Sequence, residues 1–263
     1  MKKYNGSIHM IHPTQCTVGY AEVAVKMEEL SKYEKNGELA KHLKSKEIPC
    51  VLGPDNIIYI TDHHHMGLAL TILAAEWEED NSKKTKEENP FTKCTFSILY
   101  DFSKSNLPKK EFFKVLDSLH FVHKYDENGE KQKYGEIPKR LIDLKNDPYR
   151  SLAGFVRKSG GYKKIDKPYL EFEWADYFRQ HITLEEIDND MKESVTKGVQ
   201  LALSENANKL PGWTGLEITK TLKANFVERI NNGKKKAVNF DIVDNVESVK
   251  ANNPNTKPIK FKI

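Results

Sequence analysis

Apolar residues recur along the chain at spacings that alternate between those of strands and those of helices. Two short apolar runs, 49–52 and 57–60, flank Gly53-Pro54-Asp55-Asn56. These four residues favour a hairpin, because they adopt turn dihedral angles that apolar residues avoid. A nearly continuous apolar stretch over 66–74 follows and is typical of a buried helix. Residues 62–65 therefore lie where a strand gives way to a helix, and Asp62 is its predicted N-cap.

The same spacings predict the helices and strands in the rest of the chain. We expect an extended segment over 8–18, a half-buried strand over 92–100 from its period of two, and helices that are separated by turns and loops. The dense aromatic residues of 168–179 are more typical of a core than of a binding surface. One predicted helix begins near residue 21. Further helices are predicted over 38–46, 66–74, 108–123, 147–159, 195–210 and 216–230, and a loosely held tail follows the last of them.

Composition narrows the class of protein. The chain has 263 residues, of which 38% are hydrophobic and 30% charged, and this suits a soluble globular protein. Its net charge is +4, which is too balanced to favour nucleic acid as the partner. There is no apolar run of membrane-spanning length and no apolar region after the basic N-terminus, so we expect a cytoplasmic protein without a membrane partner. The three cysteines form no Cys-x-x-Cys pair, so we expect buried free thiols.

The run Asp62, His63, His64 and His65 is the first candidate site. A helix start attracts anions, because its backbone N–H groups and the positive end of its dipole point outwards. Three adjacent side chains cannot all face one point, so at most two of the histidines serve one centre. Such a histidine can bind phosphate, act as a base or ligate a metal, and Asp62 can hold Mg²⁺. The alternative is a set of structural or solvated histidines, and the pattern favours neither reading.

A second candidate site lies around 150–163. Arg150 and Arg157 are two helical turns apart and so point the same way, and Lys163 follows in a loop. Together they form either an anion clamp or a surface helix with ordinary salt bridges. In the second case the acids of 171–176 pair with the arginines. Glycine-rich nucleotide loops, the Gly-x-Ser-x-Gly elbow and the His-Glu-x-x-His zinc motif do not occur in the sequence.

Residues 49–70 carry the pattern Pro-x-Val-Leu-Gly-Pro-Asp, six further residues, then Asp-His-His-His. This pattern resembles the signature of the ParB/sulfiredoxin superfamily. The stretches at 13–23, 148–162 and 171–176, with Leu210-Pro211-Gly212-Trp213, resemble more narrowly its ParB-like nuclease family, over roughly 8–214. The resemblance implies an α+β fold with a ParB/sulfiredoxin-like small mixed sheet and flanking helices. The domains that we expect are this core over 1–105, a mainly helical region packed on it over 106–215, and a helix with a loose tail over 216–263.

In the superfamily a nucleotide binds at the turn that 62–65 match, and relatives include DNA-segregation NTPases, sulfiredoxin and kinases of free serine. Here His63 replaces the usual Gly and Met66 the Arg that often grips phosphate. We therefore expect the phosphate to be bound by Arg150, Arg157 or Lys163. The turn has no Cys, which excludes sulfiredoxin chemistry. Glu22 lies roughly where kinase-like relatives have a general base, and the alternative is that it pairs with Lys26.

The favoured hypothesis is phosphoryl transfer from ATP, ADP or CTP, with Mg²⁺, to a small hydroxyl compound. Its catalytic residues would be Glu22, Asp62 and His64, with Asp62 also the metal ligand. The nucleotide would be bound by six side chains, namely His63, His64, His65, Arg150, Arg157 and Lys163. The alternatives are a metal-dependent nuclease acting on DNA or RNA, which the net charge disfavours, and a non-catalytic nucleotide-binding module.

Overall fold

The structure is a computed structural model that describes residues 2–81, 85 and 88–215. The helix expected over 216–230 and the tail lie outside this part of the chain. The described residues divide into two compact units. Among these residues, the first unit contains 2–18 and those of 26–145, and the second contains 19–25 and 146–215.

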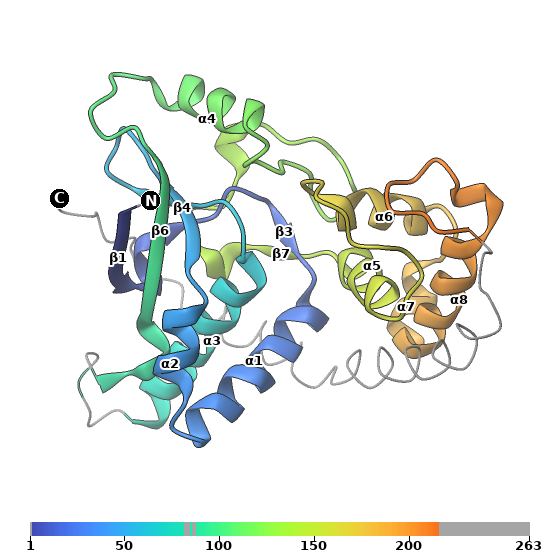
Figure 1. Ribbon diagram of the computed structural model, residues 1–263, viewed down its shortest axis with the longest axis horizontal. Coiled ribbons are helices and arrows are strands. Elements are labelled where there is room, and N and C mark those ends of the chain that lie inside the picture. The colour runs from blue at the N-terminus through green and yellow to red at the C-terminus, as the bar shows by residue number, and fades with distance from the viewer. Residues whose placement is uncertain (1, 82–84, 86–87, 216–263) are drawn as a thin grey trace. The chain divides into compact units, whose positions relative to one another are not determined.

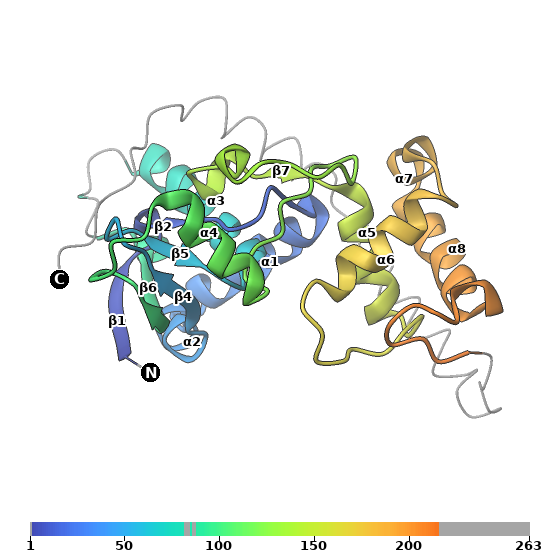
Figure 2. The same cartoon turned by 90° about the horizontal axis from the view of Figure 1, so that it is seen from above.

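The first unit is built on a five-stranded mixed sheet in the order β1-β6-β4-β5-β2 (Figure 1; β5 and β2 are labelled in Figure 2). Neighbours β1–β6 and β4–β5 are antiparallel, whereas β4–β6 and β2–β5 are parallel. The predicted hairpin is β4 and β5: the Gly53 N–H donates to the Ile57 carbonyl at 2.8 Å, and Asn56 adopts a φ of 57° in the turn. The strands are β1 (Lys2–Ser7), β2 (Ile11–His12), β4 (Ile48–Leu52), β5 (Ile58–Ile60) and β6 (Lys93–Asp101).

Helices cover both faces of this sheet (Figure 2). Successive residues of a strand point to opposite faces. Tyr59 of β5 packs in one cluster with Phe112 and Phe113 of α4 (Lys109–Ser118), whereas Ile60 lies against Gly67 of α3 (His64–Asp80). Strand β5 is therefore buried between α3 and α4. The first unit also contains α2 (Leu39–Ser45) and the greater part of α1 (Tyr20–Lys35).

The second unit is helical and contains the start of α1. Its core gathers the buried aromatic residues Phe155, Trp174 and Phe178, and the Tyr162 ring stacks on Trp174 with centroids 4.2 Å apart. The aromatic segment 168–179 is thus a core element, as its composition predicted. In the described part of this unit, the remaining α-helices are α5 (Pro148–Lys158), α6 (Leu170–Arg179), α7 (Leu184–Asn189) and α8 (Met191–Leu203).

Short elements complete the described chain. β3 (Thr17–Val18) and β7 (Lys145–Asn146) form a separate two-stranded sheet, next to which the Lys145 N–H donates to the Cys16 carbonyl. The short 3-10 helices are η1 (Ile8–Met10), η3 (Pro90–Thr92), η4 (Tyr134–Glu136), η5 (Leu141–Asp143) and η6 (Glu205–Ala207).

The α+β class with a small mixed sheet is confirmed, and the differences from prediction lie in element bounds. Strand β1 and helix α7 were not predicted, and the extended segment over 8–18 is interrupted by η1. Helix α4 ends before the expected residue 123, where His120 adopts a φ of 58° that no helix continues. Helix α8 starts early because Asp190 caps it by accepting from two backbone N–H groups. The compact units divide at 145, whereas the expected domain boundary is at 105.

Candidate functional site

The turn over 62–65 connects β5 to α3. The N-cap of α3 is His63, at a left-handed φ of 67°, and the prediction that Asp62 fills this position is wrong. The Asp62 carboxylate instead accepts from the N–H of His63 at 2.6 Å. No side chain caps α3, and its first turn contains no acidic residue. The Asp62 carboxylate thus lies beside the positive end of the dipole of this 17-residue helix, and the first turn adds no second carboxylate there.

His64 is a buried residue that holds the turn in place. Its Nε2 accepts from the Thr14 N–H at 3.2 Å, and the Thr14 hydroxyl donates to the Ile60 carbonyl at 2.7 Å. Burial, together with the neighbouring His65, His63 and His123, lowers the pKa of His64 well below its usual value. The imidazole is therefore neutral near pH 7, with Nε2 as its acceptor. This contact gives His64 a structural role, and its catalytic role stays a prediction.

The other three side chains of the turn are accessible: Asp62 is exposed, and His63 and His65 are partly exposed. Among the described residues there is no group of three or more His, Cys, Asp and Glu side chains arranged to hold a metal ion. A cation at Asp62 would thus need most of its ligands from water or from a bound phosphate, as Mg²⁺ accepts. The metal assignment to Asp62 remains a prediction.

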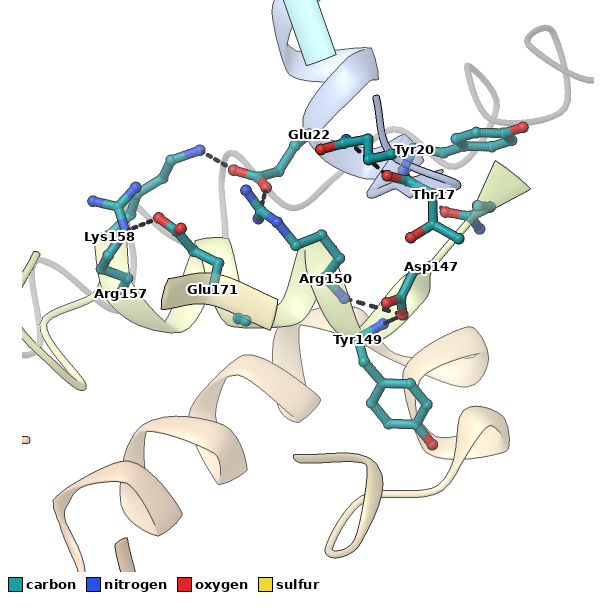
Figure 3. Close-up of polar contacts among 12 residues, drawn as sticks. Thr17, Tyr20, Glu22, Asp147, Tyr149, Arg150, Arg157, Lys158 and Glu171 are labelled. Atoms are coloured by element: carbon teal, nitrogen blue, oxygen red, sulfur yellow. Dashed lines mark hydrogen bonds and ion pairs between the residues drawn. The ribbon is translucent and has the colours of Figure 1, made fainter. Parts of the chain in front are cut away.

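Glu22 lies in a buried ion cluster of the second unit (Figure 3). Its two carboxylate oxygens contact the Arg150 guanidinium at 2.5 Å and the Lys158 ammonium at 2.8 Å, and only 10% of the Glu22 side chain is exposed. Lys26 contacts Glu29 at 2.5 Å, so the Glu22–Lys26 alternative is wrong. Two cations stabilise the ionised form of Glu22 and occupy its oxygens, which weakens it as a proton acceptor.

Arg157 continues this cluster on the same face of α5. Its Nε lies 2.8 Å from a carboxylate oxygen of Glu171 in α6. Burial would raise the pKa of Glu171, but Arg150 and Arg157 outweigh it and the pKa falls below its usual value. Burial likewise disfavours the Arg150 charge, but Glu22 and Glu171 raise the pKa of its guanidinium. Both arginines thus have carboxylate partners, but Arg150 pairs with Glu22 in a buried cluster, whereas the salt-bridge alternative predicted a surface helix paired with the acids of 171–176.

The other acids of 171–176 have different partners. Glu173 contacts Lys167 at 2.7 Å, and Asp176 contacts Arg179 at 2.7 Å, so neither pairs with Arg150 or Arg157. Lys163 is exposed in its loop, where its backbone N–H donates to the Gly212 carbonyl. Of the three cations expected to grip phosphate, Lys163 is the one for which no carboxylate contact is found in the described chain.

Asp147 is a structural position beside the ion cluster that the sequence interpretation missed. It caps α5 by accepting from the N–H groups of Tyr149 and Arg150, and its second oxygen contacts Arg179 at 3.1 Å. Burial raises the pKa of this carboxyl, although Arg179 opposes the shift. The signal was present, because Asp followed by Pro148 is an N-cap and first-turn pair. Asp147 orients the face of α5 that carries Arg150.

The structure places the two candidate sites in different units. The residues of 62–65 belong to the first unit, whereas Glu22, Arg150, Arg157 and Lys163 belong to the second. Their combination into one nucleotide site stays a prediction. In the described part of the chain, no helix is both long and apolar enough to cross a membrane.

Comparison with known proteins identifies a family and solved structures that are similar to this chain. Among curated proteins, none matches the chain. The solved structure of protein Atu1540 from Agrobacterium tumefaciens is 32% identical, with a TM-score of 0.67, and the match covers 82% of this chain and 98% of that one. A family model described as "Putative ParB-like nuclease" matches residues 4–180, which excludes the Leu210-Pro211-Gly212-Trp213 stretch. Because this match spans well over half of its length, the chain belongs to the ParB-like nuclease family.

Proposed function

We propose that this protein binds the phosphate of a nucleotide at the start of α3 and transfers a phosphoryl group to a small hydroxyl compound. One observation carries the proposal: α3 begins at a left-handed residue, without a side-chain cap and without an acidic residue in its first turn. A phosphate at this position would accept from backbone N–H groups and interact favourably with the helix dipole. The resemblance to nucleotide-binding relatives supports the same position.

In this proposal the accessible residues of the turn contact the ligand. Asp62 binds Mg²⁺ together with the phosphates, and His63 and His65 donate to phosphate oxygens when protonated. His64 positions the turn through its contact with Thr14. Glu22 organises the arginines of α5 and is a weaker candidate for the general base than the sequence suggested.

The test is calorimetric titration with ATP, ADP and CTP in the presence of Mg²⁺, using two substitutions of the turn. In the variant His65→Glu, a carboxylate enters the first turn of α3 and competes with phosphate, so affinity should fall at least tenfold. The variant His63→Gly suits the left-handed φ and keeps the backbone donors, so it should still bind. His181→Glu, at an exposed residue of the second unit, is the matched control. Absence of binding by the unsubstituted protein would refute the proposal.

Turnover is measured separately by phosphorus NMR of the nucleotide with a mixture of small hydroxyl compounds. Formation of the nucleoside diphosphate, or monophosphate from ADP, together with a new phosphomonoester supports transfer. Binding without turnover would instead identify a nucleotide-binding module.

A metal-dependent nuclease is the second candidate, and the family match favours it. It predicts cleavage of plasmid or RNA with Mg²⁺ or Mn²⁺ by the unsubstituted protein but not by the variant Asp62→Asn. Equal cleavage by both proteins would indicate a contaminating nuclease and count against this candidate.

A further inference from the structure

A cavity of about 670 Å³ lies in the first unit beside α4 and η4. Its volume falls within the roughly 300–1,000 Å³ that is usual for small-molecule sites. None of residues 62–65 lines it, so it is distinct from the proposed phosphate site. Four lysines and two aromatic residues determine its chemistry, namely Lys109, Lys110, Lys124, Lys133, Phe113 and Tyr134.

The aromatic wall of the cavity is held rigidly. Phe113 is buried and stacks on Tyr134 with centroids 5.9 Å apart. The Tyr134 hydroxyl donates to the Asp117 carboxylate at 2.7 Å, and the Lys124 ammonium lies 3.9 Å from the centre of the Tyr134 ring. Lys124 also pairs with Asp117, so its charge is balanced within the wall. This wall offers an apolar surface whose shape is already formed.

The remaining lysines leave an excess of positive charge. Lys109 lies 4.0 Å from Asp55, and 58% of its side chain is exposed. Lys110 and Lys133 are exposed, and no carboxylate lies within ion-pair distance of either among the residues described. Glu136 also lines the cavity, but its carboxylate accepts from the Lys133 backbone N–H at 2.7 Å. An anion at the rim would therefore meet cations with weak or absent partners.

We propose that this cavity binds a small organic anion, with an apolar ring system against Phe113 and Tyr134 and a carboxylate, sulfonate or phosphate beside Lys110 and Lys133. The apolar wall contributes burial of the ring, and the lysines select for negative charge. Neither the family match nor the candidate nucleotide site requires this second site.

The probe is anilinonaphthalene sulfonate, whose fluorescence rises on transfer to an apolar site, compared with N-phenyl-1-naphthylamine, which has the same rings but no sulfonate. The double variant Lys110→Glu/Lys133→Glu should weaken binding of the sulfonate at least tenfold and leave binding of the uncharged probe within threefold. Lys41→Glu/Lys44→Glu, at two exposed lysines of α2, is the matched control.

A second variant tests whether the probes bind in this cavity, without changing its charge. A Cβ atom added at Gly135, which lines the cavity, meets no atom within 4 Å, and Gly135 has no left-handed φ. Gly135→Leu should therefore fold normally and reduce the affinity for both probes.

The proposal is overturned if neither substitution alters sulfonate binding while both variants stay folded by circular dichroism. It is also overturned if a hexaglutamate peptide displaces the sulfonate probe at equal concentration, because the site would then recognise an acidic peptide.

Discussion

Gly154 shows how closely the buried ion cluster is packed. A Cβ atom at this residue of α5 would come within 2.5 Å of the Glu22 carboxylate. Real Cβ atoms do not approach this closely, so a larger residue would push Glu22 away from its cations. The absence of a side chain at Gly154 is therefore part of what allows Glu22 to reach Arg150.

We predict that Gly154→Ala lowers the free energy of unfolding by about 1–2 kcal/mol, because overpacking outweighs the better helix propensity of Ala. Urea denaturation measures the change. Gly135→Ala, where the added methyl group has open space, is the control and should change stability by less than about 0.5 kcal/mol. Stabilisation by Gly154→Ala would show that Glu22 is not tightly held.

At the scale of elements, two of the glutamates in α1 lie in contrasting settings. Glu22 and its partner Arg150 expose only 10% and 12% of their side chains, whereas Glu29 and Lys26 each expose 38%. Exposed ion pairs contribute little because water screens them, but removal of one member of a buried pair leaves the other charge without compensation. The start of α1 is therefore fixed to α5 by charge as well as by packing.

We predict that Glu22→Gln lowers the free energy of unfolding by about 3 kcal/mol and Glu29→Gln by less than about 1 kcal/mol. The double variant Glu22→Gln/Arg150→Met, which removes both charges, should recover part of the loss. Chemical denaturation of the four proteins checks this. Equal effects of the two single substitutions would contradict the assignment of Glu22 to a buried cluster.

For the whole molecule, buried histidines make stability depend on pH. Burial, with Lys109 adding to it, lowers the pKa of His12 to about 4, and the pKa of His64 also lies well below its usual value. Both residues are neutral in the folded state near pH 7 and take up protons more readily when unfolded. Their contribution is therefore complete above about pH 6.5 and is lost as the pH falls towards 4.

We predict that the free energy of unfolding falls between pH 7 and 4, by about 3 kcal/mol through His12 and by a further amount through His64. Denaturant titrations at several pH values measure this, and His12→Gln and His64→Gln should each flatten the dependence. The exposed His181, replaced by Gln, is the control and should leave the slope unchanged. A slope that neither buried substitution alters would rule out these residues as its source.

The local residue pattern was enough to predict most of the helices and strands and to indicate the family. The hairpin of β4 and β5 follows from Gly53 to Asn56, and α5 from its apolar period, because turn angles and helix faces depend on residues close in the chain. The separated motifs also indicated the ParB-like family that the comparison confirmed. The short strand β1 was missed because no such signal accompanies it.

Only the tertiary structure decided how the candidate residues are used. Glu22 meets Arg150 and Lys158 across 128 and 136 residues, and His64 accepts from Thr14 across 50. The sequence marked each of these residues as chemically capable, but spacing within one helix or turn contains no information about distant partners. Burial and these partners give His64 and Glu22 structural roles. Packing decides this, because it sets both the desolvation of a group and the charges beside it.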